Sequence, residues 1–222
     1  MPSSSASPSW SASMALPEVT RLTLYGDLSS GNCLKTRWVA DLLGLEHDWV
    51  AVDVVAGEAR SDAFLAINPL GKVPLARWPG GRTLPESNAI MLYLAETSPG
   101  GERLLPRDPF ARAQMMSWLF WEQYSHEPAI AVRRYQRHLL GLADDEIDPA
   151  LLTKGHAALA IMQMQFSYAD WCVGDALSLA DVALVAYTRW AHEGGFDLAD
   201  YPAVAGWVHR VEDALGIEHT SP

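Results

Sequence analysis

Two short stretches of the sequence carry groups that could bind a peptide. The first, NPLGKVPLA (residues 68–76), places Pro74 near the start of an expected strand at 73–78. Proline has no backbone N–H to donate to a neighbouring strand. With a cis bond before Pro74, the N–H and C=O of Val73 would stay free, and they could pair with a peptide laid alongside as an added strand.

The second stretch, LPESNAI (residues 84–90), places Glu86 and Ser87 where a helix is expected to begin. Free N–H groups and the positive dipole end of a helix favour anions. The Ser87 hydroxyl could therefore bind a carboxylate, while Glu86 could hold an ammonium group. An ordinary helix cap is the alternative reading. Next to the peptide-pairing edge, such a site suits a small peptide with an unusual α-amino acid end.

The elements that must position these groups are mixed in type. Strand-like alternation occurs at residues 21–26, 47–55, 73–78 and 82–84. Helical periodicity occurs between and after them, at residues 32–44, 61–67 and 86–96. The first two strands flank a helix, so they should be parallel. A βαβ unit joined by a helix to a ββα unit predicts an α/β thioredoxin-like domain over residues 20–97.

The second half of the chain is expected to be all-helical over residues 109–215, after a Pro- and Gly-rich linker at 98–108. Helices are expected at 110–137, 151–168, 178–190 and 202–215. Ser178 and Asp181 form a capping-box variant at the start of a helix that is apolar on nearly all sides. Residues 1–19, rich in Ser, Ala and Pro, predict a disordered tail without a signal peptide, and residues 216–222 a short tail.

Composition excludes several classes of function. The 222 residues carry a formal net charge of −11, which disfavours nucleic acid and anionic membrane surfaces as partners. No apolar run approaches the ~20 residues of a membrane span. Cys33 and Cys172 provide neither a disulfide framework nor a metal-ligand spacing. We therefore expect a cytoplasmic protein that uses no metal.

The quoted motifs resemble one family. NPLGKVPLARW followed by LPESNAIMLYLAE resembles the glutathione-binding half of cytosolic glutathione S-transferases, and SLADVAL resembles their helical-domain capping motif. The resemblance covers about residues 21–215 and favours the bacterial type, similar to the Ser-type theta and delta classes. It implies a glutathione co-substrate, a homodimer and the conjugation or reduction of small hydrophobic electrophiles.

The resemblance also implies roles for individual residues. Val73, next to Pro74, would pair with the cysteinyl backbone of glutathione, and Lys72 would lie near the glycine end. Glu86 and Ser87 would hold the γ-glutamyl end. Some classes have a histidine in the loop after the second strand, where this chain has GEARS, and Arg60 is the substitute that we expect to contact a carboxylate.

The residue that activates the thiol is expected in DLSSGNCLK, between the first strand and the first helix. A hydroxyl donor and helix N-terminal N–H groups can stabilise a thiolate. The resemblance aligns Ser30 with the catalytic serine, with Asn32 as an additional donor. Ser29 is the alternative one residue earlier, and Ser30 could instead simply cap the helix. Tyr25, at the strand end, is expected in the core.

The electrophile is expected against the helical half, where residues 118–138 form the densest aromatic stretch. Tyr124, His126 and Arg133 are the candidates to reach the cleft, and Pro128 predicts a kinked or loosened helix near His126. Two other functions remain open. The chain could be a glutathione-fold binding or scaffold protein without turnover, or a thiol oxidoreductase that depends on Cys33.

Overall fold

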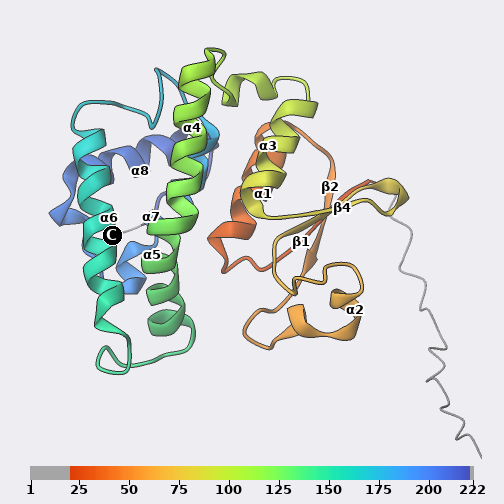
Figure 1. Cartoon of the computed structure of the whole chain (residues 1–222), viewed down its shortest axis with the longest axis horizontal. Coiled ribbons are helices and arrows are strands. Elements are labelled where there is room, and N and C mark those ends of the chain that lie inside the picture. The colour runs from red at the N-terminus through yellow and green to blue at the C-terminus, as the bar shows by residue number, and fades with distance from the viewer. Residues whose placement is uncertain (1–20, 221–222) are drawn as a thin grey trace, which may run out of the picture.

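The computed structural model describes residues 21–220, so the predicted tail at residues 1–19 lies outside the described part. Within it, a sheet-containing half and a helical half lie side by side (Figure 1). The first half contains β1 (Leu22–Gly26), α1 (Gly31–Leu42), β2 (His47–Ala51), α2 (Asp62–Leu65), β3 (Leu75–Arg77), β4 (Thr83–Pro85) and α3 (Ser87–Thr97). The second contains α4 (Pro109–Trp121), α5 (Glu127–Arg134), α6 (Pro149–Phe166), α7 (Leu179–Thr188) and α8 (Pro202–Leu215).

The four strands form one mixed sheet in the order β2-β1-β3-β4. β1 and β2 are parallel, with Leu22 opposite His47, as the βαβ pattern predicted. β3 is antiparallel to both of its neighbours, with Thr23 opposite Arg77 and Leu75 opposite Pro85. The thioredoxin-like order predicted from the sequence is confirmed.

β2 is shorter than predicted, because it ends at Ala51 and not near residue 55. The chain then turns, and the turn satisfies its own backbone N–H groups. The N–H of Asp53 donates to Glu58 Oε2 at 2.8 Å, and the N–H of Ala56 donates to Asp53 Oδ1 at 2.8 Å. Local side-chain acceptors of this kind compete with a strand ladder.

α1 and α3 lie between the sheet and the helical half, while α2 covers the other face of the sheet (Figure 1). On that outer face Tyr25 packs edge-on against Phe64 at a centroid distance of 6.2 Å, so Tyr25 belongs to a small core cluster, as predicted. The main core is continuous from β1 through α1 and α3 into α7. One hydrophobic core therefore holds the two halves together.

α7 is the central buried helix of the molecule, and all ten of its residues are buried. The predicted capping box is present, because Ser178 and Asp181 bond reciprocally at its start. The Asp181 carboxylate also accepts hydrogen bonds from Trp207 Nε1 at 3.0 Å and the Cys172 N–H at 2.8 Å. The cap thus links α7 to α8 and to the loop that precedes it.

The predicted helix at residues 110–137 is interrupted twice. A π-helical turn at Glu122–His126 joins α4 to α5, and a second one at Tyr135–Leu139 follows α5. Pro128 lacks the N–H that a continuous α-helix needs at that point. The loosened helix predicted near His126 is therefore confirmed, and its form is a π turn.

Short 3₁₀ turns complete the described chain, at Glu58–Arg60, Pro79–Gly81, Gly101–Leu104, Ala191–Gly194 and Leu198–Asp200. The expected linker at 98–108 contains one of them, and Leu104 and Leu105 within it are buried in the main core. No described helix is long and apolar enough to cross a bilayer.

Candidate functional site

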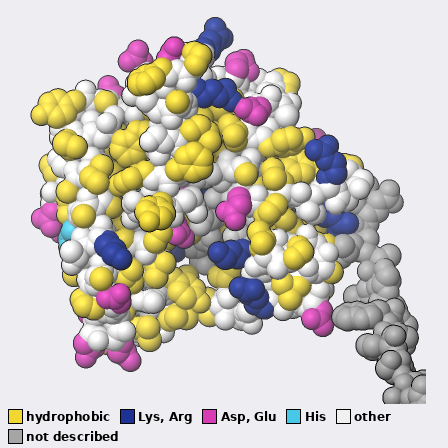
Figure 2. All heavy atoms as spheres, in the orientation of Figure 1, with side chains coloured by type: hydrophobic (Ala, Val, Ile, Leu, Met, Phe, Trp, Pro, Cys, Tyr) yellow, Lys and Arg dark blue, Asp and Glu magenta, His cyan; other side chains and the backbone are white. Residues whose placement is uncertain are grey.

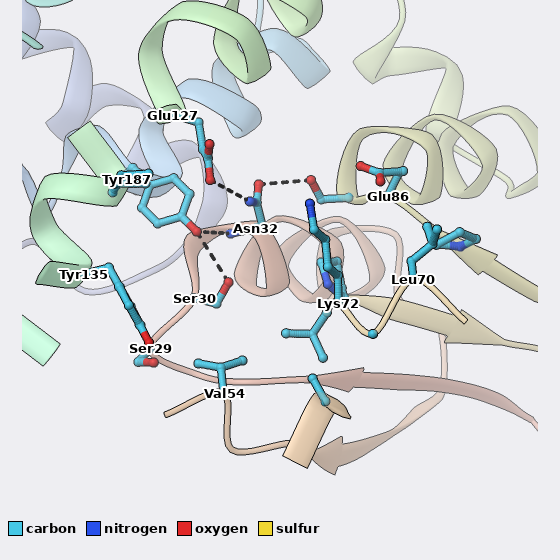
Figure 3. Close-up of a pocket in the computed structure, with 18 of the residues that line it drawn as sticks. Ser29, Ser30, Asn32, Val54, Leu70, Lys72, Glu86, Glu127, Tyr135 and Tyr187 are labelled. Atoms are coloured by element: carbon cyan, nitrogen blue, oxygen red, sulfur yellow. Dashed lines mark hydrogen bonds between the residues drawn. The ribbon is translucent and has the colours of Figure 1, made fainter. Parts of the chain in front are cut away.

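A cavity of about 550 Å³ lies between the two halves of the molecule. The loop after β1, the segment before β3 and the start of α3 form one wall, and α5 and α7 form the other (Figure 3). Its lining residues are Ser29, Ser30, Asn32, Val54, Gly57, Ala59, Arg60, Leu70, Gly71, Lys72, Val73, Pro74, Pro85, Glu86, Ser87, Gln123, Glu127, Ala131, Val132, Arg134, Tyr135, Leu139 and Tyr187. These include every residue that the sequence assigned to catalysis or to peptide binding.

Asp27 fixes the loop that enters α1. Its carboxylate accepts hydrogen bonds from the N–H of Ser29 at 2.8 Å, the hydroxyl of Ser29 at 2.7 Å and the N–H of Val54 at 3.1 Å. Burial alone would raise the pKa of Asp27, but these bonds hold it below its usual value. The Ser29 hydroxyl is therefore engaged within the loop.

Ser30 is the N-cap residue of α1, yet its side chain makes no capping hydrogen bond. Its hydroxyl lies 3.4 Å from the hydroxyl of Tyr187, which reaches the site from α7 (Figure 3). N-cap serines ordinarily accept from the helix backbone. Because the Ser30 hydroxyl is not used in this way, it is available to the cavity.

Asn32, on the first turn of α1, is a hydrogen-bond hub. Its Oδ1 accepts from Lys35 Nζ at 2.8 Å, Ser87 Oγ at 3.1 Å and Gln123 Nε2 at 3.1 Å. Its Nδ2 donates to Glu127 Oε1 at 3.5 Å. Asn32 thus joins α1 and α3 to the helical half and is held in one orientation.

A buried ion pair lies directly behind Asn32. Lys35 Nζ is 2.8 Å from Glu122 Oε1, and both side chains are 0% exposed. The other carboxylate oxygen of Glu122 accepts from Asn88 Nδ2 at 3.2 Å and Gln123 Nε2 at 2.9 Å. A buried charge pair is tolerated when such bonds satisfy it. No local pattern signals this pair, because Lys35 and Glu122 are 87 residues apart.

Glu127 brings a second carboxyl group into the cavity wall. Burial raises its pKa above the usual value, and the nearby Glu122 carboxylate raises it further. The sequence analysis missed this residue, although it follows His126 directly. A half-buried carboxyl group with a raised pKa is typical of a functional site.

The segment before β3 presents its backbone to the cavity. The Val73–Pro74 peptide bond is cis, as predicted. Among residues 21–220, neither the N–H nor the carbonyl of Val73 has a hydrogen-bond partner. Asn68 Nδ2 donates to the carbonyl of Lys72 at 2.7 Å and secures the preceding turn. The free backbone groups of Val73 can pair with an extended peptide.

Gly71 allows the Arg60 side chain to cross this segment. A Cβ on Gly71 would lie 2.8 Å from Arg60 Nη1, and its φ of +58° favours glycine. Arg60 and Lys72 are exposed cations at the same end of the cavity. Together they form a local positive region in an acidic chain, which suits a carboxylate.

The start of α3 combines a helix N-terminus with an unusual backbone conformation. Glu86 has φ +72°, the only positive φ at a non-glycine residue among those described. Such conformations cost on the order of 1–3 kcal/mol and concentrate at ligand sites. Ser87 is buried, and its hydroxyl donates to Asn32 Oδ1 at 3.1 Å. The free N–H groups of α3 can bind a carboxylate here.

None of the three predicted electrophile residues lines the cavity. Tyr124 is 87% exposed on the outer surface. His126 is fully buried, and its Nε2 bonds to Thr188 Oγ1 at 2.9 Å. Arg133 donates to the carbonyl of Gly194 at 2.8 Å and to Asp144 at 2.6 Å.

The π turn at Glu122–His126 accounts for the position of Arg133. Each π turn adds one residue to the helix, so every later side chain is rotated by about 100° relative to an unbroken α-helix. Arg134 and not Arg133 therefore faces the site. Its Nη1 donates to the carbonyl of Ser29 at 2.6 Å, while its guanidinium stacks 4.2 Å from the Trp190 ring and pairs with Glu193. Arg134 thus clamps the loop that carries Ser30.

Cys33 does not reach the cavity. It is 0% exposed, and burial raises the pKa of its thiol to about 11. Reactive cysteines are accessible and have lowered pKa values. Cys172 is also buried, and burial raises its pKa well above the usual value. The structure therefore disfavours thiol chemistry at either residue.

One group among the described residues brings metal-binding side chains together. Donor atoms of His209, Glu212 and His219 lie within 4.8 Å of one another, on α8 and the segment after it, away from the cavity. Glu212 Oε1 already accepts from Arg189 Nε at 2.8 Å. Because this pair neutralises the carboxylate, we assign no metal to the group.

Both halves of the chain match a known protein family. Residues 29–97 match the family model of the glutathione S-transferase N-terminal domain, and residues 119–214 match that of the C-terminal domain. A glutathione S-transferase structure from Xanthobacter autotrophicus Py2 is 42% identical, covers 90% of this chain and 97% of its own, and superposes with a TM-score of 0.82.

Two further relatives are more distant. Glutathione S-transferase theta-1 of Rattus norvegicus is 33% identical over 204 residues, 88% of this chain and 84% of its own. The structure of Ure2p in complex with glutathione has a TM-score of 0.77 over 89% of this chain and 92% of its own. At 23% identity, it supports the fold alone.

Proposed function

The chain belongs to the glutathione S-transferase family, and we propose that it is an active transferase that binds glutathione in the cavity between its two halves. The glutathione thiolate would attack a small hydrophobic electrophile. One observation carries the proposal. Ser30 sits at the start of α1 with a hydroxyl that neither caps the helix nor bonds within its own loop.

The cavity suits glutathione along its whole length. The free N–H and C=O of Val73 would pair with the cysteinyl backbone. Arg60 and Lys72 would bind the glycine carboxylate, and the start of α3 would bind the γ-glutamyl carboxylate, with Glu86 holding the ammonium group. Ser87 would exchange its bond to Asn32 for one to the carboxylate.

In the proposed reaction the bound thiol loses its proton to solvent, and its sulfur forms a bond to the electrophilic carbon. The leaving group departs as an anion, or a proton adds where the electrophile is an activated double bond. Ser30 donates a hydrogen bond to the sulfur and stabilises the thiolate before attack. Ser29 is less suitable, because its hydroxyl donates to Asp27 at 2.7 Å.

The electrophile would lie against α5 and the π turn that follows it. Val132, Tyr135 and Leu139 line this part of the cavity and are largely apolar. They replace the three residues that the sequence suggested. Their side chains form a surface for a small hydrophobic molecule, and the Tyr135 hydroxyl is the one polar group among them.

Two further proposals concern the state of the protein. We propose a homodimer, because Phe110 and Phe120 on α4 and Tyr124 just beyond it are 72%, 69% and 87% exposed. Figure 2 shows hydrophobic side chains spread over the face that α4 presents. Exposed apolar surface of this kind marks interaction sites. We also propose a cytoplasmic location, which suits two free cysteines.

The test is conjugation of glutathione to a chlorinated nitroaromatic electrophile. Ser30→Ala should lower kcat/KM on the order of tenfold to a hundredfold, because a hydrogen bond to a charged group contributes roughly 1.5–3 kcal/mol. The pH at which activity rises should move upward, since less of the bound thiol is ionised. Ser29→Ala is the matched control and should leave that pH unchanged.

Glutathione binding is measured separately from turnover. Millimolar glutathione should raise the melting temperature of the wild-type protein and of Ser30→Ala, because a ligand of the folded state stabilises it. Binding without turnover would favour the scaffold reading. Loss of activity in Cys33→Ser, with Ser30→Ala unaffected, would favour a thiol oxidoreductase.

A further inference from the structure

Tyr187 is a buried tyrosine on the largely apolar helix α7, and it was not among the residues expected from the sequence. Its hydroxyl lies 3.3 Å from the backbone N of Asn32 and 3.4 Å from Ser30 Oγ (Figure 3). Both partners belong to the first turn of α1, whereas Tyr187 comes from α7. The contact therefore joins the centre of the helical half to the proposed catalytic serine.

The direction of one proton is fixed by the chemistry of the groups. A backbone N–H can only donate, so the Tyr187 oxygen must accept from Asn32. Either hydroxyl can donate in the contact between Tyr187 and Ser30, and in the arrangement that serves the reaction the phenolic proton goes to Ser30 Oγ. The proton of Ser30 is thereby left free to point into the cavity. The chain of donors runs from Asn32 N–H through Tyr187 to Ser30.

We propose that Tyr187 is a positioning residue that orients and polarises Ser30, so that the serine proton points at the thiolate of bound glutathione. This inference rests on the proposed function of the cavity. A hydroxyl that accepts a hydrogen bond becomes a better donor, by roughly 10–30% per bond. It also loses its freedom to rotate toward other acceptors, such as the backbone carbonyls of its own loop.

Gly31 makes the contact between α1 and α7 possible. A Cβ at this position would lie 2.7 Å from the carbonyl oxygen of Ala186 and 3.0 Å from Cδ1 of Tyr187. Cβ atoms essentially never come so close to another heavy atom. Only glycine lets the start of α1 approach α7 closely enough for the tyrosine hydroxyl to reach Ser30. Glycine between Ser30 and Asn32 therefore allows both residues to contact the Tyr187 hydroxyl.

The surroundings keep Tyr187 protonated and therefore able to donate. Burial raises its pKa far above the usual value, and the Glu127 carboxylate raises it further. The charged and titratable groups that face this cluster come from every neighbouring element: Glu127 and Arg134 on α5, Cys33 and Lys35 on α1, Asp27 in the loop after β1 and Lys72 before β3. The titration that the proposal concerns is that of the bound glutathione thiol.

The test is a double-mutant cycle with wild type, Ser30→Ala, Tyr187→Phe and the double variant. Phenylalanine keeps the ring and removes only the hydroxyl. From the polarisation above, Tyr187→Phe should lower kcat/KM by up to about fivefold, leave KM for glutathione unchanged and shift the pH profile upward by a few tenths of a unit. In the Ser30→Ala background the same change should have no effect, because its target is gone.

Two measurements separate a positioning role from a structural one. The ultraviolet absorbance of bound thiolate, titrated against pH, should show the same upward shift in Tyr187→Phe without any need for turnover. Tyr201→Phe removes a comparable hydroxyl, which bonds to His156 Nδ1 at 2.8 Å outside the cavity, and it should leave the titration unchanged.

The outcomes distinguish the inference from the proposed function. If Ser30→Ala slows conjugation but Tyr187→Phe matches wild type, the positioning role is refuted and the transferase proposal stands. Equal losses from Tyr187→Phe in both backgrounds also refute it, because the tyrosine would then act independently of Ser30. If Ser30→Ala leaves rate and titration unchanged, the role proposed for Ser30 fails first, and the positioning role fails with it.

Discussion

Replacing Lys35 with methionine should destabilise the protein, although Lys35 does not line the cavity. The Lys35 ammonium lies 2.8 Å from Glu122, and neither side chain is exposed to water. At an effective dielectric constant of about 20, the attraction is roughly 6 kcal/mol. Burial of the two ions costs several kcal/mol each, so the intact pair contributes little net stability.

Removing one ion leaves the cost of the other. In Lys35→Met the Glu122 carboxylate stays buried with only the amides of Asn88 and Gln123, at 3.2 Å and 2.9 Å, to stabilise it. Breaking a buried pair costs roughly 3–5 kcal/mol. Because two hydrogen bonds remain, we expect the lower end, about 3 kcal/mol. That is a large part of a total stability of roughly 5–15 kcal/mol.

The assay is urea unfolding followed by tryptophan fluorescence, at one fixed protein concentration because a dimer would make stability depend on it. The melting temperature should fall by roughly 6–12 °C for a chain of this size. The double variant Lys35→Met/Glu122→Gln, which removes both charges, should be more stable than Lys35→Met alone. A loss of unfolding free energy below about 1 kcal/mol in Lys35→Met would refute the reasoning. So would a double variant whose loss equals the sum of the losses in Lys35→Met and Glu122→Gln.

Three other predictions concern the packing, the titration and the assembly. Gly31→Ala should lower the free energy of unfolding by roughly 1–3 kcal/mol, because the new Cβ would lie 2.7 Å from the carbonyl oxygen of Ala186. Gly206→Ala is the control: its Cβ would have no atom within 4 Å, so the helix should gain about 1 kcal/mol of stability. Urea unfolding measures both changes. Burial lowers the pKa of His126 from 6.5 to about 4, so between these values only the unfolded chain takes up the proton. Stability should therefore fall by roughly 3 kcal/mol as pH drops through that window, and a pH series of unfolding curves should show this loss in wild type and not in His126→Gln. Phe120→Lys should shift sedimentation from dimer to monomer without changing the fold, and a wild-type monomer at micromolar concentration would contradict the homodimer.

The sequence by itself determined the fold and most of one cavity wall. Alternation and periodicity predicted the βαβ and ββα order, because side-chain direction repeats with fixed periods of 2 and 3.6 residues. Val73, Glu86 and Ser87 were predicted from motifs at the ends of these elements, which chain order brings to one edge of the sheet, whereas the resemblance to the transferase family indicated Ser30 and Asn32. The capping box of α7 was also local and therefore visible.

Tertiary structure decided what lies opposite that wall. Tyr187, Glu127 and Arg134 reach the cavity from elements about 100 or more residues away from Ser30, and no local period encodes such a meeting. The π turn at Glu122–His126 rotates the later side chains, so Arg134 lines the cavity in place of the predicted Arg133. Distinguishing the hydroxyl of Ser29 from that of Ser30 also required the tertiary structure. Asp27 engages the hydroxyl of Ser29, and only the packing of α1 against α7 leaves that of Ser30 facing the cavity.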